Sequence, residues 1–424
     1  MKIAVVGTGI AGNVASHHLS REHELVVYEA GDYVGGHTHT HQVEQAGRLF
    51  SVDTGFIVYN DWTYPNFIRL LDSLGVETQP SSMSFSVRDE TSGLEYNGTT
   101  LDTLFAQRRN LVRPSFWRMI RDILRFNREA PALLAGSGDG PTLGDFLAEG
   151  GYSRQFVEHY IVPMGAAIWS TAPQLVQRFP ARFFVRFFHN HGMLSVDARP
   201  QWRVVRGGSA RYVEKLTAPF RDRIRLRTPV EWVRRLPGQV LVKAQGHEVE
   251  SYDTVFLACH SDQALKLLAD PTRDEREVLG AIPYQRNEAV LHTDASLLPR
   301  SRRAWAAWNY HVPTERRSQV SLTYNMNILQ SLDAPEPFLV TLNHSDAIDP
   351  DRIVKRIAYD HPLYTPRGVA AQARQREING VHRTYYCGAY WRNGFHEDGV
   401  VSALAALEHL GEDLHAQRTL SRVG

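Results

Sequence analysis

The chain has 424 residues, 43% of them hydrophobic and 22% charged, which is typical of globular proteins and excludes a disordered or fibrous chain. The 47 Lys and Arg residues balance 46 Asp and Glu residues to a formal net charge of +1, so charge gives no indication of a nucleic-acid partner, and none is expected. Two cysteines, Cys259 and Cys387, are too few for a disulfide framework or a cysteine-rich metal site.

The chain opens with a strand, a glycine turn, a helix and a second strand, predicted at residues 3–6, 7–12, 13–20 and 25–29. In the turn Gly7-Thr8-Gly9-Ile10-Ala11-Gly12, the first glycine permits the tight bend and the second lets a backbone approach a pyrophosphate. The third lets the helix pack closely on the strand. Glu29 ends the second strand, where its carboxylate can accept hydrogen bonds from ribose hydroxyls. The pattern predicts dinucleotide binding; the alternative is a purely structural turn with a solvated Glu29.

The remaining elements suggest two interleaved lobes. Residues 100–135 predict helices, followed by a glycine-rich loop at 136–141, and a second glycine turn at 207–209 precedes strands near 230–233, 240–242 and 255–258. Residues 385–410 predict a strand, a loop and a helix. We therefore predict an α/β fold, with a Rossmann-like nucleotide-binding lobe from residues 1–80, 200–285 and 376–424. An α+β substrate lobe is predicted from residues 81–199 and 286–375.

Further motifs distinguish between possible dinucleotides. Gly35-Gly36-His37 follows the second strand, and Val52-Asp53-Thr54-Gly55, Val205-Arg206-Gly207-Gly208-Ser209 and Glu397-Asp398-Gly399-Val400 come later. In this order the motifs resemble the FAD-binding blocks of the flavin amine oxidase, phytoene desaturase and protoporphyrinogen oxidase superfamily, over nearly the whole chain. His37 departs from that pattern, which usually has Arg there.

The resemblance implies non-covalently bound FAD as the cofactor. It implies that FAD is held by Gly7, Gly9, Ile10, Ala11, Gly12, Glu29, Ala30, Gly35, Gly36, His37, Thr38, Asp53, Thr54, Gly55, Val230, Gly388, Asp398, Gly399 and Val400.

A narrower likeness lies in residues 164–170, 199–202 and 394–399. These strings resemble a bacterial branch of NAD/FAD-binding proteins similar to the flavin domain fused to plant cyclopropane fatty-acid synthases. This resemblance implies desaturase-like redox chemistry on a fatty-acyl chain.

The distribution of lysine bears on the substrate. Many amine oxidases of the superfamily place a lysine near flavin N5, but this chain has none between Lys266 and Lys355, and residues 287–292, where that strand is expected, offer no amine. We therefore predict an FAD-dependent oxidoreductase that transfers a hydride from a substrate C–H to flavin N5, on a fatty-acyl or lipid substrate. The alternatives are an amine or amino-acid oxidase, or a non-catalytic flavoprotein that assists a lipid-modifying enzyme; the electron acceptor is unknown.

Histidines and acids supply the candidate catalytic groups. His396 and Glu397 are candidates for a general base, whereas Asp398 is interpreted as a cap that binds the first amides of the last helix. His37, His39 and His41 would share one face of a strand, but without a fourth ligand we predict no metal site.

The sequence also contains a helix rich in arginine and a cluster of phenylalanines. Arg118, Arg121, Arg125 and Arg128 recur at helical spacing, so this helix presents either a solvated face or a contact with anionic lipid. A phenylalanine cluster either lines an acyl tunnel or, as is commoner, forms part of the core. It consists of Phe179, Phe183, Phe184, Phe187 and Phe188. No stretch of the sequence approaches the roughly 20 apolar residues that cross a bilayer. We expect a cytoplasmic protein, with peripheral contact at the inner membrane surface as a further option.

Overall fold

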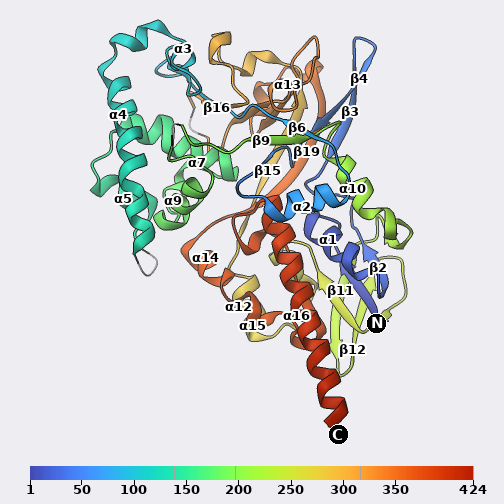
Figure 1. Cartoon of the computed structure of the whole chain (residues 1–424). Helices are drawn as coiled ribbons and strands as arrows, with labels where there is room; N and C mark the ends of the chain where they lie inside the picture. Colours follow the sequence, from blue (N-terminus) through green and yellow to red (C-terminus); the bar gives the residue numbers. More distant parts are fainter. Residues whose placement is uncertain (137–139, 196, 316, 424) are drawn as a thin grey trace.

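The fold is seen in a computed structural model that describes residues 1–136, 140–195, 197–315 and 317–423 (Figure 1). Residues 137–139 of the predicted glycine-rich loop lie outside the described residues.

A five-stranded parallel sheet forms the first layer, in the order β10-β2-β1-β14-β20. Its strands are β1 (Lys2–Val6), β2 (Glu24–Tyr28), β10 (Ile224–Arg225), β14 (Thr254–Leu257) and β20 (Thr384–Tyr386). The helices α1 (Ile10–Leu19), α10 (Ala210–Thr217) and α16 (His396–Val423) pack together beside it, with Val5, Val27 and Phe256 in their shared core. The other face is covered by the antiparallel strands β11 (Val230–Leu236), β12 (Gln239–Ala244) and β13 (Glu250–Tyr252).

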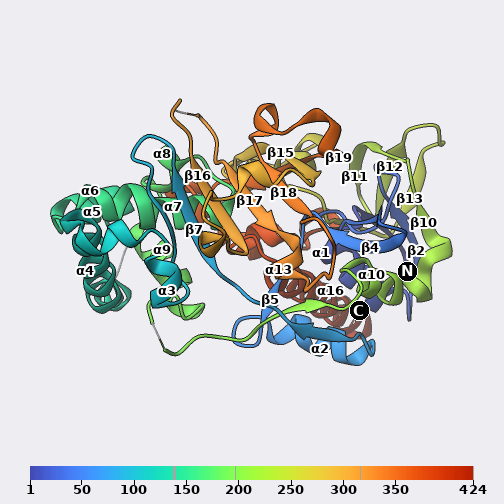
Figure 2. The ribbon, with the colours of Figure 1, turned by 90° about the horizontal axis from the view of Figure 1, so that it is seen from above.

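The second layer is a seven-stranded sheet in the order β19-β15-β18-β17-β16-β7-β8. Its strands are β7 (Phe85–Asp89), β8 (Glu95–Asn97), β15 (Tyr284–His292), β16 (Trp308–Val312), β17 (Leu322–Asn325), β18 (Leu339–Leu342) and β19 (Ile353–Pro362). The helical part of this lobe comprises α3 (Leu101–Leu104), α4 (Pro114–Glu129), α5 (Leu143–Glu149), α7 (Val162–Trp169) and α9 (Ala181–Asn190). Seen from above, these helices lie at one end of the molecule and β2, β10 and β11 at the other (Figure 2).

Several shorter elements join the two layers. They are the hairpin β3 (Thr40–Gln45) and β4 (Arg48–Asp53), the helix α2 (Pro65–Ser73), and the sheet of β5 (Tyr59–Asn60), β9 (Trp202–Val205) and β6 (Thr78–Pro80). The helices α11 (Ser261–Leu267), α14 (Pro366–Gln372) and α15 (Gln375–Ile378) each contact α12 (Arg273–Leu279), which lies with α15 below the second layer in Figure 1. The interleaved α/β architecture is thus the predicted one, while the exact lobe boundaries stay predictions.

Two local predictions differ from the structure. The first helix begins at Ile10 rather than at residue 13, because Ile10, Ala11 and Gly12 already belong to its buried first turn. The strand that follows His37 and His39 begins only at Thr40. Since His37 and His39 precede the strand, the three histidines do not share one strand face as the sequence pattern predicted.

Candidate cofactor-binding and active site

The opening glycine turn lies between the end of β1 and the start of α1. Gly7 has a φ of +103°, and a Cβ on Gly12 would overlap the carbonyl oxygen of Gly7 and lie 3.1 Å from the Cβ of Ala258. Gly9 differs, because no heavy atom lies within 4 Å of the place its Cβ would take. It is also the N-cap of α1 and provides no side-chain cap. The first amides of α1 therefore face open space, the arrangement that binds a phosphate at a helix N-terminus.

The second glycine pair packs against this turn. Gly36 has a φ of +60°, and its Cβ would lie 3.0 Å from the Cα of Gly9. A Cβ on Gly35, whose φ is +137°, would overlap the carbonyl oxygen of Thr38. The Thr38 hydroxyl in turn lies 2.7 Å from the Tyr212 hydroxyl. The two glycine turns are thus held side by side.

Glu29 connects the loops beside the turn. One carboxylate oxygen accepts a hydrogen bond from the Thr8 amide at 2.9 Å and another from the Thr8 hydroxyl, and the second oxygen accepts from the Gly31 amide at 2.8 Å. The Glu29 carbonyl accepts from the amide of Thr228, two residues before Val230 at the start of β11. Ala30 lies between Glu29 and Gly31. The segment of Glu29 and Ala30 therefore lies beside the segment that leads into Val230. The contact of Glu29 with the ribose stays a prediction.

The C-terminal block brings a second helix N-terminus to the same place. A Cβ on Gly399 would lie 2.5 Å from Cγ2 of Ile10, so the first turns of α16 and α1 meet at van der Waals distance. Val400 is buried behind them, and the Gly388 amide donates to the Ser402 hydroxyl at 2.7 Å. Two helix N-termini, each with its partial positive charge, thus converge beside the glycine turns.

The three residues at the start of α16 each have protein partners. His396 stacks on Phe56, with ring centroids 3.5 Å apart, and its Nε2 lies 2.7 Å from the Tyr212 hydroxyl and 3.0 Å from the Thr38 hydroxyl. Burial lowers the pKa of His396 to about 3. A neutral, buried ring with these partners positions Thr38 and Phe56 more readily than it exchanges protons with a substrate.

Glu397 and Asp398 serve as caps. Glu397 accepts from the backbone and side-chain amides of Asn66 and from the Phe67 amide, and so caps the N-terminus of α2. These contacts favour a structural role over the predicted general base. Asp398 accepts from the amides of Asn393 and Phe395, in the loop just before α16 and not in its first turn as predicted. Burial raises the pKa of Asp398 to about 7, although these amides lower it.

Asp53 fastens the second glycine block. It accepts from the amide and hydroxyl of Ser209, from Thr40, and from Gln330, and it is fully buried. Burial raises its pKa to about 6, while the hydroxyl and amide donors oppose the shift. These partners give Asp53 a positioning role, and its predicted contact with the cofactor stays a prediction.

A cluster of imidazole rings lies where the two lobes meet. The ring of His37 stacks on Tyr359 at 4.8 Å and lies 5.3 Å from His361 and 6.1 Å from His260. Burial lowers the pKa of His37 well below its usual range and that of His361 to about 4. The Nε2 atom of His37 is buried without a hydrogen-bond partner. We call His37, His260, Tyr359 and His361 the histidine cluster.

Sequence reasoning missed three members of the histidine cluster. His260 follows β14, and Tyr359 and His361 lie on β19. The signal was the position of His260 just beyond the strand that ends near the cofactor; nothing local marked β19. Nearby, Thr54 bonds the Tyr359 hydroxyl at 3.0 Å, and a Cβ on Gly55 would overlap the carbonyl oxygen of His37. In the part of the chain that the structure describes, no group of three or more His, Cys, Asp or Glu side chains is arranged to hold a metal ion.

The phenylalanine cluster is core. Phe184 and Phe188 are fully buried and stack at 4.3 Å, and Trp169 lies 4.8 Å from Phe187. Phe183 is partly exposed and stacks on Tyr364 at 4.8 Å. These contacts support the core interpretation over the tunnel.

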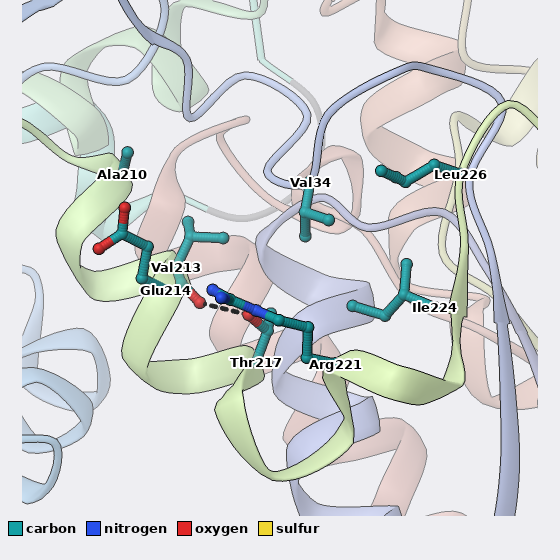
Figure 3. Close-up of a pocket in the computed structure, with 8 residues that line it drawn as sticks. All are labelled: Val34, Ala210, Val213, Glu214, Thr217, Arg221, Ile224 and Leu226. Carbon is teal, nitrogen blue, oxygen red and sulfur yellow. Dashed lines mark hydrogen bonds between the residues drawn. The ribbon is translucent and has the colours of Figure 1, made fainter.

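Two cavities lie outside the histidine cluster. One of about 310 Å³ lies against α10, where the buried Val213 and the exposed Glu214 and Arg221 line it (Figure 3). None of the predicted site residues contributes to it. The other, of about 420 Å³, lies where α2, the end of α9 and the start of α16 meet, and it includes Glu397 and Asp398.

The residues present fit FAD. The open backbone at Gly9 and the uncapped N-terminus of α1 provide a cradle for a dinucleotide diphosphate, and the unpartnered Nε2 of His37 is a buried polar atom without a protein partner. The unpartnered polar atoms of Tyr390 and Trp391 lie just after Gly388, in the C-terminal block. The sheet, the converging helix termini and the glycine turns define a dinucleotide-binding α/β oxidoreductase fold.

Comparison with known proteins identifies the family. Residues 10–294 match the family described as flavin containing amine oxidoreductase. The chain belongs to this family and is an FAD-dependent oxidoreductase.

Solved structures with the same fold cover nearly the whole chain. Cyclohexylamine oxidase from Brevibacterium oxydans IH-35A has a TM-score of 0.70 at 16% identity, over 98% of this chain and 99% of that one. A putative protoporphyrinogen oxidase from Exiguobacterium sp. 255-15 has a TM-score of 0.68 at 18% identity, over 97% and 99%. A fatty acid isomerase from P. acnes that produces CLA has a TM-score of 0.66 at 16% identity, over 96% and 98%.

One characterised relative matches a short segment. The flavin-dependent L-tryptophan oxidase RebO of Lentzea aerocolonigenes is 44% identical over 55 residues, which are 13% of this chain and 12% of that protein. Among the described residues, no helix combines the length and the apolar character needed to cross a membrane.

Proposed function

We propose that this protein oxidises a fatty-acyl or lipid substrate, with a hydride passing from a substrate C–H bond to the flavin. The observation that carries the proposal is that the imidazole rings of the histidine cluster lack a carboxylate in direct contact, although Asp262 and Asp360 act on His260 from further away. Burial keeps His37 and His361 neutral at physiological pH, and among the described residues no carboxylate forms an ion pair with the histidines of the cluster. A cationic amine would lose its hydration there without a carboxylate in direct contact with the imidazole rings, whereas an acyl chain carries no charge to desolvate.

The strand predicted to carry the lysine of amine oxidases supports the same substrate class. Asn287 on β15 is fully buried, and its Nδ2 donates to Nδ1 of His361 at 2.8 Å. Its Oδ1 accepts from Nδ2 of Asn343 at 2.8 Å. These two hydrogen bonds fix His361 as the tautomer that carries its proton on Nε2. His361 thus presents a neutral donor rather than an ammonium group.

Bound FAD supplies the hydride acceptor, flavin N5. The chain's own residues bind the diphosphate at Gly9, orient the cluster through Asn287, and exclude water by burial. The electron acceptor that returns the flavin to its oxidised state is not identified by these residues.

An amine or amino-acid oxidase is the second candidate. The family match and the segment shared with an L-tryptophan oxidase favour it. It requires an anionic group close to the flavin, and Asp360, next to His361 on β19, is the nearest carboxylate in sequence.

Anaerobic mixing of the FAD-loaded protein with candidate donors tests the proposal. Phospholipid vesicles should bleach the flavin absorbance near 450 nm, whereas amines and amino acids should leave it unchanged. Bleaching by an amine, with peroxide released on admission of air, would establish the second candidate instead. A flavin that no donor reduces, in a protein that a partner lipid-modifying enzyme needs, would establish a non-catalytic role.

Matched variants locate the effect. Asn287→Ala removes the partner of His361 and should slow bleaching, with a changed pH profile because the tautomer is no longer fixed. Asn343→Ala acts one step further away and should slow it less. If both variants slowed bleaching equally, with no change in the pH profile, the Asn343–Asn287–His361 hydrogen bonds would serve only the fold.

A further inference from the structure

Exposed apolar side chains gather at one end of the molecule. Of the twelve large hydrophobic residues that are exposed in the described part of the chain, five lie between residues 101 and 124. Val112 is 82% exposed, Leu124 53% and Trp117 48%. They belong to α3, the turn that follows it and α4, which lie at the end of the molecule away from the parallel sheet in both views (Figures 1 and 2). The five are Leu101, Leu111, Val112, Trp117 and Leu124.

Helix α4 places apolar and basic residues on one outward stripe. Its inner face carries Phe116, Met119 and Phe126, which are buried. Its outer stripe recurs at spacings of three and four residues, so its members share one face. The stripe consists of Pro114, Trp117, Arg121, Leu124 and Arg128, all of them exposed. We call this stripe, together with Leu111, Val112 and Arg118, the α4 surface.

The charge around the α4 surface is mostly positive. Residues 108–129 contain seven arginines and two acidic residues: Asp122, which is buried and accepts from the Ser153 amide, and Glu129, which forms ion pairs with Arg125 and Arg128. Within the described residues, neither Arg118 nor Arg121 forms an ion pair. The whole chain carries only +1, so this local excess of positive charge is a property of the α4 surface.

We propose that the α4 surface docks the protein on an anionic lipid bilayer. Arginines beside exposed apolar residues combine headgroup attraction with shallow insertion, the pattern of peripheral helices that lie in the membrane interface. The Trp117 ring suits that depth, since its Nε1 donates to the Leu111 carbonyl at 2.8 Å and leaves an apolar ring face outside. A second copy of the chain fits poorly, because a symmetric contact would place the arginines of both copies against one another. The inference rests on the proposed function, in which the bilayer also supplies the acyl chain.

Vesicle co-sedimentation of the FAD-loaded full chain tests the docking without requiring turnover. Vesicles of phosphatidylcholine with 30 mol% phosphatidylglycerol should bind the protein, and vesicles of phosphatidylcholine alone should bind it at least about tenfold less. Binding should weaken in 0.5 M salt, because the headgroup attraction is screened. The double variant Arg118→Glu with Arg121→Glu should bind at least about 25-fold less, at roughly a factor of five for each of the two positive charges lost, with further loss from the two negative charges introduced. The matched control, Arg276→Glu with Arg367→Glu on α12 and α14, should bind like the wild type.

A second pair of variants tests the apolar part. Leu124→Ser should weaken binding severalfold, and Leu49→Ser, at an exposed leucine in the β3–β4 hairpin, should not. Equal binding to both vesicle types, or equal loss in the charge control, would overturn the proposal. A change of oligomeric state in Arg118→Glu with Arg121→Glu, without a change in vesicle binding, would also overturn it and assign the surface to a second copy. Vesicle binding without flavin bleaching would retain the docking and remove the lipid as substrate, so the two proposals fail separately.

Discussion

Replacing Gly9 by alanine separates cofactor binding from the stability of the fold. Gly9 has φ −66° and ψ −179°, angles that alanine adopts without strain. Its Cβ would have no protein atom within 4 Å. Alanine is the poorer N-cap by about 0.5–1 kcal/mol, but it restricts the unfolded chain by about 0.4–1 kcal/mol. We therefore expect the free energy of unfolding of the apoprotein to change by less than about 0.5 kcal/mol.

The same methyl group would occupy the open space in which a diphosphate approaches the backbone. FAD affinity should therefore fall at least about tenfold, which is ~1.4 kcal/mol in binding free energy. Isothermal titration calorimetry of FAD into the apoprotein measures the affinity, and urea unfolding of the apoprotein followed by circular dichroism measures the stability.

Gly12→Ala is the matched control. Its Cβ would overlap the Gly7 carbonyl oxygen and lie 3.1 Å from the Ala258 Cβ, so α1 must move away from β1. Overpacking of this kind costs about 1–3 kcal/mol, and this variant should lose both stability and FAD. If Gly9→Ala bound FAD like the wild type, or lost as much stability as Gly12→Ala, the diphosphate would not lie in front of Gly9.

Three further predictions follow from buried polar groups. Glu397→Gln weakens the cap of α2 and should cost about 1–2 kcal/mol in urea unfolding with the pH–rate profile intact; a 100-fold loss of kcat would instead restore Glu397 as general base. The folded-state pKa of Asp398, raised to about 7 from 3.8, means that the native state binds more protons than the unfolded state. Wild-type stability should thus fall as pH rises from about 4 to 7. In Asp398→Asn, the Tm measured over this pH range should fall less steeply. A slope equal to that of the wild type would show that Asp398 is not the group that titrates. Arg235→Met leaves the buried Glu275 without its ion pair and should destabilise by about 3–5 kcal/mol, with recovery in Arg235→Met combined with Glu275→Leu; no recovery would show that packing, not charge, was lost.

The sequence by itself determined the nucleotide-binding turn and the order of the motifs. A strand of apolar residues followed by glycines at 7, 9 and 12 specifies its own backbone, because the tight turn and close packing it needs exclude side chains. The family and its FAD cofactor followed from such local blocks. The lack of lysine on β15 was visible in the same way, since composition along one strand needs no tertiary information.

Only the tertiary structure decided which partner each polar side chain takes. Glu397 was a plausible base in sequence, but folding sets it against the first amides of α2, more than 300 residues away along the chain. His37 looked like part of a strand with His39, but it packs on Tyr359 and His361 from β19. Local patterns fix backbone conformation, whereas burial, pKa and hydrogen-bond partners depend on contacts between segments that no local pattern encodes.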